Sequence, residues 1–340
     1  MVSGYNSSLG WLEIKGNHFE IGRQLGIAGR KAVHRYLIGS PVWNEVLQPK
    51  FTPQIDAMMG QTRLQFPHIW DEISGLADGL GLPVEQVAAW NCRGDLLMSV
   101  PDGCTTVQIP GSEPTIGHNE DGLPFFRGSC FIADVKPENA SGFISFYYPG
   151  SIPGHTFAIT KTGLVQTVNN LRLLNISPQI PRMVLGRAIL DMPDIDAALS
   201  LLQTALPSGG FHFTLAQGGS DRIASVEFGT GECVLRDLTK PSVHANHALN
   251  DQKGYTDQII TQSSGDRQSH GSHLIASGII NPLEILRDKT GSGLPIYRDQ
   301  PDDPDCENTL ATLVVNVGQD TIEWQIFDRI SKTPAYQSTN

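Results

Sequence analysis

The sequence lacks several features that would assign it to a common class of protein. It has no run of about 18 apolar residues, so we expect no transmembrane helix and no membrane partner. Its 24 Lys and Arg residues are outnumbered by 35 Asp and Glu, and the net charge of −11 argues against binding to nucleic acid. It has no G-x-G-x-x-G or Walker phosphate loop, no fixed-period repeat and no low-complexity tract. What remains is a globular chain, because 39% apolar residues is too many for a disordered one.

Paired cysteines are also missing. The five cysteines are Cys92, Cys104, Cys130, Cys233 and Cys306. None of them forms a C-x-x-C pair, which excludes a zinc ribbon and a thioredoxin motif. The first twenty residues lack the basic and then apolar stretch of a signal peptide, and the final QSTN is neither a reticulum nor a peroxisome address. We therefore expect a cytoplasmic protein with free thiols, one of which is chemically special.

Hydrophobic periodicity predicts helices in the first hundred residues and strands after them. The spacing of apolar residues predicts a short strand at Leu12–Lys15, followed by helices at His18–Leu37, Ile69–Leu80 and Pro83–Met98. From Cys104 the period is two. We predict strands at Thr105–Ile109, Thr115–Glu120, Cys130–Val135, Phe143–Tyr148, Thr156–Thr160, Leu164–Asn169, Phe211–Gln217, Arg222–Phe228, Cys233–Asp237, Val243–Asn246, Leu310–Val317 and Thr321–Phe327. Further helices are predicted at Pro181–Leu190, Ile195–Ala205, Leu274–Ile280 and Pro282–Arg287.

Segregated runs of helices and strands define the expected fold class. There is no long alternation of strand and helix of the kind that builds a parallel sheet. The pattern favours an α+β protein in which two antiparallel sheets pack together and helices cover them.

The segment Asp102-Gly103-Cys104-Thr105-Thr106 is the sharpest chemical feature. Gly103 can adopt backbone angles that other residues cannot, which suits a peptide bond that the Cys104 thiol attacks. Cleavage there would make Cys104 a new N-terminus, whose α-amine has a reference pKa of roughly 7.7–8.0 and could act as the base for its own thiol. The alternative is a buried cysteine that opens a strand after a turn.

Two H-x-x-H pairs offer a competing interpretation. His244 with His247 and His270 with His273 could ligate a transition metal, which would make the chain a metal-dependent hydrolase. However, we expect the first pair on a strand, where residues three apart point to opposite faces, and the second in a loop or at a helix start.

The chain resembles a known family of enzymes along nearly its whole length. Gly103-Cys104-Thr105-Thr106-Val107 is similar to the self-cleavage site of the acyl-CoA:6-aminopenicillanic acid acyltransferase family, which belongs to the autoproteolytic N-terminal-nucleophile hydrolases. Other family segments are resembled in the same order: Gly16–Gly22 with Gly26, Gly117–Asp121, Gly163–Asn169, Val243–His247, Ser263-Ser264 with Arg267, and Asn308–Thr312. Each is weak alone, but the ordered set is specific.

The resemblance implies roles for five residues. Cys104 would be both the self-cleavage nucleophile and the acyl-accepting thiol. Asp121 would lie near the new N-terminus, although Asp-Gly is also a common turn. Asn246 and Asn169 would donate to the oxyanion, Asn169 through its backbone, although both could instead cap strand ends. Arg267 would pair with the active-site carboxylate or hold a substrate acid. The alternative is that Arg267 is a solvated loop arginine.

Two choices of residue stay open at this point. Asn170 stands next to Asn169, and only the strand register decides which of them faces the site. The related penicillin V acylases have an Arg just before the active-site Asp, whereas this chain has His118, Asn119 and Glu120 there. Glu120 or His118 could therefore share the role of Asp121.

The resemblance also implies the organisation and activity of the chain. Residues 1–103 would form a helical propeptide that stays bound as a small subunit, and 104–340 a catalytic large subunit in a four-layer αββα fold. The enzyme would hydrolyse the C–N bond of small N-acyl amides without a cofactor or metal, with an acyl-enzyme on Cys104. Acyl transfer from a CoA thioester or amide to an amine is the alternative, and a non-catalytic binding protein is another. Association with further copies of the chain stays open.

Overall fold

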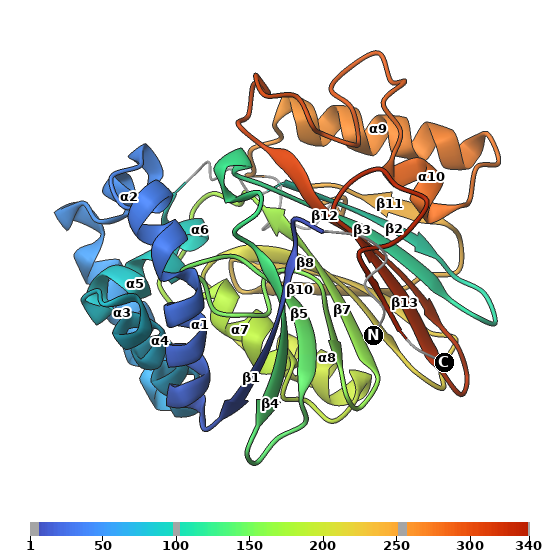
Figure 1. Cartoon of the computed structure of the whole chain (residues 1–340). Coiled ribbons are helices and arrows are strands. Elements are labelled where there is room, and N and C mark those ends of the chain that lie inside the picture. The colour runs from blue at the N-terminus through green and yellow to red at the C-terminus, as the bar shows by residue number, and fades with distance from the viewer. Residues whose placement is uncertain (1–6, 98–102, 251–256, 339–340) are drawn as a thin grey trace.

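The computed structural model describes residues 7–97, 103–250 and 257–338 as a layered α+β fold (Figure 1). Within these residues the strands form two sheets. The eight-stranded sheet runs in the order β1-β4-β5-β6-β7-β8-β9-β10, and the six-stranded sheet in the order β11-β2-β3-β12-β13-β14. Every neighbouring pair is antiparallel except β1 and β4, which are parallel. The predicted pair of antiparallel sheets is confirmed, with this one exception.

The strand bounds match the predicted strands closely. The eight-stranded sheet contains β1 (Gly10–Gly16), β4 (Phe131–Pro137), β5 (Phe143–Tyr147), β6 (Ala158–Thr160), β7 (Leu164–Leu171), β8 (Gly210–Gln217), β9 (Ile223–Gly229) and β10 (Glu232–Asp237). The six-stranded sheet contains β2 (Gly103–Ile109), β3 (Thr115–Gly122), β11 (Ser242–His244), β12 (Asn308–Val317), β13 (Ile322–Phe327) and β14 (Tyr336–Gln337). The short β14 was not predicted.

The helices surround the two sheets. The α-helices are α1 (His18–Ala32), α2 (Pro41–Val46), α3 (Thr52–Gln65), α4 (Pro67–Leu80), α5 (Val84–Asn91), α6 (Arg93–Leu96), α7 (Arg182–Ile189), α8 (Ile195–Thr204), α9 (Gln262–Ala276) and α10 (Pro282–Leu286). A π-helical turn (Val33–Leu37) extends α1, and 3₁₀ turns occupy Pro49–Phe51 and Pro124–Phe126.

The elements stack as helices, sheet, sheet and helices. Helices α9 and α10 cover the outer face of the six-stranded sheet, whereas α7 and α8 lie on the outer face of the other sheet (Figure 1). The inner faces of the two sheets meet through side-chain hydrogen bonds, such as that from Gln108 Nε2 to Thr214 Oγ1 at 2.8 Å. These layers confirm the predicted αββα arrangement. Its physical reason is that the apolar faces of two sheets require both a common core and an outer cover.

Glycines let α1 and α4 pack backbone to backbone. A Cβ atom on Gly22 would lie 1.9 Å from the carbonyl oxygen of Glu72, and one on Gly75 would lie 1.9 Å from that of Phe19. A buried ion pair then joins this helical layer to α7, because Arg187 Nε lies 3.0 Å from Glu72 Oε2 with both side chains fully buried. Helices α1 and α4 are thus packed against each other and, through this ion pair, against α7.

Two helix predictions are wrong in their bounds. The helix predicted at Leu274–Ile280 is instead α9, which begins twelve residues earlier, after the capping residue Thr261. The sequence SSGDRQSHGSH lacks an apolar stripe because α9 buries polar residues toward the sheet. The helix predicted at Pro83–Met98 breaks at Cys92 into α5 and α6, and Met98 lies outside the described residues.

All five cysteines lie in the described part of the chain, and none of them forms a disulfide there. Among its helices, none is both long and apolar enough to cross a membrane.

Candidate active site

Cys104 stands at the start of a central strand, where the hairpin β2–β3 brings it beside the predicted carboxylates. Its register partner on β3 is Glu120, and that of Gly103 is Asp121. The Cys104 side chain is 4% exposed, and its Sγ lies 4.0 Å from Glu120 Oε1. The turn at Gly111–Pro114 therefore sets the register that places two acidic residues next to the candidate nucleophile.

Asn246 and Arg267 hold the backbone of Cys104. The main-chain N–H of Cys104 donates to Asn246 Oδ1 at 2.9 Å, and Arg267 Nη1 donates to the Cys104 carbonyl oxygen at 2.6 Å. Arg267 Nη2 donates to the same Asn246 Oδ1 at 2.7 Å, and Asn246 Nδ2 donates to the Asn170 carbonyl oxygen at 3.2 Å. Segments some 140 and 160 residues away in sequence thus converge on one residue.

Arg267 is a buried residue of α9 and not a solvated loop arginine. Its Nη1 also donates to Thr105 Oγ1 at 2.9 Å, and its Nε to Ser263 Oγ at 3.0 Å. Burial lowers the pKa of Arg267, while the carboxylates of Asp121 and Glu307 act to raise it. The charge of Arg267 is therefore stabilised by two nearby carboxyl groups.

Asp121 is fully buried behind Gly103. Thr309 Oγ1 donates to its Oδ1 at 2.6 Å, and among the described residues its Oδ2 has no hydrogen-bond partner. Burial raises the pKa of Asp121, while Arg267 and Arg298 oppose the rise. Asp121 therefore lies within the electrostatic reach of Arg267, while Thr309 supplies its hydrogen bond.

Glu307 is a functional candidate that sequence reasoning missed. A Cβ atom on Gly103 would lie 2.3 Å from Glu307 Oε2, so a side chain at this position would displace the carboxyl group. Arg298 Nη1 holds that oxygen at 2.6 Å, and Arg172 Nη2 lies 3.4 Å from the other. Burial raises the pKa of Glu307 to about 7 against the charges of its arginine neighbours. The close approach of the Glu307 carboxyl group gives a reason for a glycine at position 103.

His118 and Glu120 form a buried pair on β3. His118 Nε2 lies 3.2 Å from Glu120 Oε2, and His118 Nδ1 lies 2.8 Å from Thr106 Oγ1. Burial lowers the pKa of His118 to about 3, so the ring is neutral near pH 7. Both open candidates from the sequence are thus at the site, and Glu120 Oε1 lies 4.0 Å from the thiol sulfur.

The strand register separates Asn169 from Asn170. The Asn169 carboxamide is used between the sheets, where its Oδ1 accepts from Thr106 Oγ1 at 2.7 Å and its Nδ2 donates to the His244 carbonyl oxygen at 3.0 Å. Asn170 instead lines a small pocket with Cys104. Successive side chains of β7 point to opposite faces, so only one of the pair can face the pocket.

The pocket at Cys104 is lined by residues from several separate elements of the chain. Besides Cys104, its walls come from Arg93, Glu120, His155, Asn170, Arg182, Met183 and Phe211. Two of these residues, Glu120 and Asn170, were open candidates from the sequence. The two arginines give no local sequence signal, because their place depends on how α6 and α7 meet.

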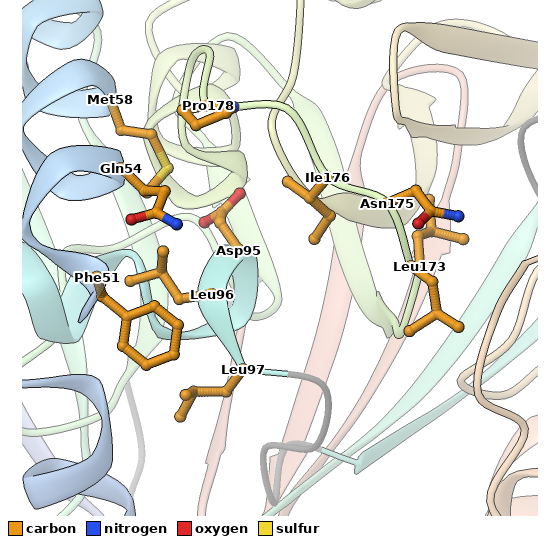
Figure 2. A pocket seen from close by; sticks show the side chains of 11 residues that line it. Phe51, Gln54, Met58, Asp95, Leu96, Leu97, Leu173, Asn175, Ile176 and Pro178 are labelled. Carbon is orange, nitrogen blue, oxygen red and sulfur yellow. The ribbon is translucent and has the colours of Figure 1, made fainter. Parts of the chain in front are cut away.

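A larger pocket of about 380 Å³ lies between α3, α6 and the segment after β7 (Figure 2). Its walls are mostly apolar, with Phe51, Gln54, Met58, Asp95, Leu96, Leu97, Leu173, Leu174, Asn175, Ile176 and Pro178. Asp95 is 4% exposed, and among the described residues its Oδ2 has no hydrogen-bond partner. Its Oδ1 accepts from the Arg182 main-chain N–H at 3.1 Å, so this wall adjoins the smaller pocket. Burial raises the pKa of Asp95 to about 6.

The two predicted histidine pairs do not assemble into a metal centre. His244 Nε2 bonds Glu227 Oε1 at 2.8 Å, whereas His247 Nδ1 bonds Ser264 Oγ at 2.7 Å. His270 and His273 lie inside α9, not in a loop or at a helix start as predicted. Throughout 7–97, 103–250 and 257–338, neither pair belongs to a group of three ligands.

Comparison with known proteins gives the class of this chain. The model of the acyl-coenzyme A:6-aminopenicillanic acid acyl-transferase family matches residues 109–329, so the chain belongs to that family. It is 23% identical to the beta-alanyl-dopamine/carcinine hydrolase of Drosophila melanogaster, over 97% of this chain and 92% of that protein. It also matches a crystal structure of a variant of conjugated bile acid hydrolase from Clostridium perfringens, at 11% identity and a TM-score of 0.43, over 67% of this chain and 90% of that one. The chain is thus an amide hydrolase or acyltransferase.

Proposed function

We propose that the chain is an amide hydrolase that cleaves itself between Gly103 and Cys104 and then uses Cys104 as its nucleophile. One observation carries the proposal: Asn246 Oδ1 holds the Cys104 nitrogen while Arg267 holds both the Cys104 carbonyl oxygen and Asn246. A buried thiol at a strand end needs no such framework for packing. An N-terminal nucleophile does, since its amine and thiol must both be positioned.

Self-cleavage would begin with attack of the Cys104 sulfur on the carbonyl carbon of Gly103. The C–N bond breaks as the thiol proton passes to the Cys104 nitrogen, which leaves a thioester between the two residues. Water then hydrolyses the thioester and yields the Gly103 carboxylate, the Cys104 thiol and a free α-amine. Asn246 Oδ1, which accepts from the amide N–H in the uncleaved chain, is placed to accept from this amine.

The mature enzyme would use that amine as its general base. The α-amine takes the thiol proton, the sulfur attacks the carbonyl carbon of an N-acyl amine, and the returned proton leaves with the amine product. Water releases the acid from the acyl-enzyme. Asn246 Nδ2 and the main-chain N–H of Asn169, the predicted oxyanion pair, would stabilise the tetrahedral intermediate, a contribution of ~3–4 kcal/mol for one donor in other hydrolases. The Asn169 side chain does not serve in this role, because its carboxamide is used between the sheets.

The cleaved fragment 1–103 would remain bound as a small subunit. Strand β1 lies within the eight-stranded sheet beside β4, and the buried ion pair of Glu72 with Arg187 crosses the division. Removal of the fragment would expose that charge and a sheet edge, both of which are costly.

The substrate would be a small N-acyl amine, and β-alanyl-dopamine is the first compound to test because the Drosophila relative is named for it. The larger pocket adjoins the Cys104 pocket and offers an apolar cavity with one buried carboxylate, Asp95. A carboxylate oxygen without a partner suits an ammonium group on the substrate. Asp95→Asn should therefore raise KM at least tenfold for β-alanyl-dopamine but leave KM for an uncharged N-acyl-dopamine within threefold. Equal changes for both substrates would contradict this assignment.

Intact-mass measurement tests the processing step. The purified wild type should give fragments of roughly 11 and 26 kDa, whereas Cys104→Ala should stay whole and inactive. Cys233→Ala is the matched control, because this half-buried thiol on β10 lies outside the site. Addition of an acyl-CoA and an amine to the processed enzyme separates the activities: release of acid indicates a hydrolase, and a new amide indicates an acyltransferase. A single uncleaved chain that is fully active would refute self-processing.

A further inference from the structure

A chain of hydrogen bonds behind Cys104 determines where the protons lie. Asn169 Nδ2 faces the carbonyl oxygen of His244 at 3.0 Å, which can only accept, so Asn169 Oδ1 is the atom that faces Thr106. The single hydroxyl proton of Thr106 therefore goes to Asn169 Oδ1 at 2.7 Å. Thr106 Oγ1 must then accept from His118 Nδ1, which lies 2.8 Å away and carries a proton.

The other ring nitrogen of His118 is consequently an electron-pair donor. An imidazole that carries its proton on Nδ1 has a lone pair on Nε2, and this atom faces Glu120 Oε2 at 3.2 Å. Two acceptors at that distance need a positive group between them. A proton shared with the carboxyl group of Glu120 can supply it, and so can a metal cation.

The thiol of Cys104 completes a set of three ligands. The Cys104 Sγ, the His118 Nε2 and one Glu120 oxygen all lie within 4.8 Å of one another, and all three side chains are buried. In the described part of the chain no other His, Cys, Asp and Glu side chains gather in this way. Zinc bonds of about 2.0–2.3 Å place tetrahedral ligand atoms roughly 3–4 Å apart, close to the spacing here.

We propose that Cys104, His118 and Glu120 bind a zinc ion that inhibits the enzyme. On binding, the thiol proton and the proton between Glu120 and His118 go to solvent, and the metal bonds to the thiolate, the imidazole nitrogen and the carboxylate. The fourth tetrahedral position is left to water in the small pocket that Cys104 and Glu120 line. The sulfur lone pair is then committed to the metal and cannot attack a carbonyl carbon. The binding of zinc does not depend on the proposed function, whereas the inhibition by zinc rests on it.

Direct binding of metal to the full-length chain is the first test. Chelator-treated wild type should bind one zinc ion, measured by calorimetry and elemental analysis, and cobalt should give a thiolate charge-transfer band. His118→Gln and Glu120→Gln should each weaken zinc binding at least tenfold. His270→Gln is the matched control, since it removes a histidine from another histidine–carboxylate pair that has no thiol. No binding, or equal binding by all four proteins, would overturn the proposed site.

Reactivity of the thiol gives a second measurement that needs no variant. Zinc should protect Cys104 of the wild type from alkylation, read by peptide mass, and a chelator should restore both labelling and amide hydrolysis. Loss of hydrolysis with no protection of Cys104 would place the metal elsewhere and overturn the proposal. Activation by zinc would overturn both the inhibition and the thiol mechanism. Protection in a protein without hydrolase activity would support the metal site and refute only the proposed function.

Discussion

Arg267 is the residue whose loss should most clearly separate this site from an ordinary buried cysteine. Its guanidinium donates to the Cys104 carbonyl oxygen, Thr105 Oγ1, Asn246 Oδ1 and Ser263 Oγ. Arg267→Gln leaves most of these acceptors without a donor, and each hydrogen bond to a charged group contributes ~1.5–3 kcal/mol. The bonds are not additive, so we expect the unfolding free energy to fall by about 3–5 kcal/mol, as for a broken buried ion pair.

The activity of Arg267→Gln should fall further than its stability alone explains. The Asn246 oxygen that holds the Cys104 nitrogen would lose one of its two donors, and Asp121 would lose the positive charge that most opposes the rise of its pKa. We expect self-cleavage and amide hydrolysis to slow at least 100-fold in protein that is folded by circular dichroism. A misplacement of about 1 Å is enough for such a loss.

Two measurements with a control decide the Arg267 prediction. Urea unfolding gives the stability change, and the time course of fragment formation by intact mass gives the processing rate. Arg222→Gln is the control, because that partly exposed arginine pairs with Asp237 and Asp196 at the surface and should cost less than ~1 kcal/mol. If Arg267→Gln is as stable as Arg222→Gln and cleaves at the wild-type rate, the framework around Cys104 has no function.

Two further predictions concern Gly103 and Glu307. Gly103→Ala should lower the unfolding free energy by ~1–3 kcal/mol, because its Cβ would lie 2.3 Å from the Glu307 carboxyl group that Arg298 holds. Gly111→Ala is the control, because it lies at an open turn of the same hairpin and should leave the stability nearly unchanged. Equal urea midpoints for the two variants would contradict this prediction. Glu307 has a pKa raised from 4.5 to about 7, so the folded chain binds its proton more tightly than the unfolded chain. Its contribution to stability is therefore fully present below pH 4.5 and falls as pH rises to about 7, by about 3 kcal/mol. Glu307→Gln should remove this component from the difference in urea stability between pH 4 and pH 8, and an unchanged difference would show that Glu307 does not titrate as described.

The strands were the part of the fold that periodicity could predict. Segments such as Leu164–Leu171 and Asn308–Val317 carry β-branched and apolar residues between turn signals, and the predicted bounds lie within two residues of the observed ones. Helix α9 could not be predicted in the same way. Its inward face carries Ser263, Ser264 and Arg267, and a polar face that is buried by hydrogen bonds has no hydrophobic periodicity.

Some residues of the candidate site could likewise be predicted from local sequence, and others could not. The pair Gly103-Cys104 could be singled out by itself, because glycine before cysteine at the start of a strand is a local pattern. Glu307 could not, since nothing near it in sequence indicates that it approaches Gly103. The importance of Arg298 beside it also depends on that long-range packing.

The sequence alone determined the αββα class of this protein, the hairpin that carries Cys104 and its resemblance to a family of self-cleaving enzymes. Those are local properties, since periodicity, turns and short motifs act through neighbours along the chain. Only the tertiary structure decided that Asn170 and not Asn169 lines the pocket, that Arg267 is buried against Cys104 and that Glu307 fills the space beside Gly103. These depend on the register of β7 and on the packing of distant segments, which are determined by the energy of the whole core.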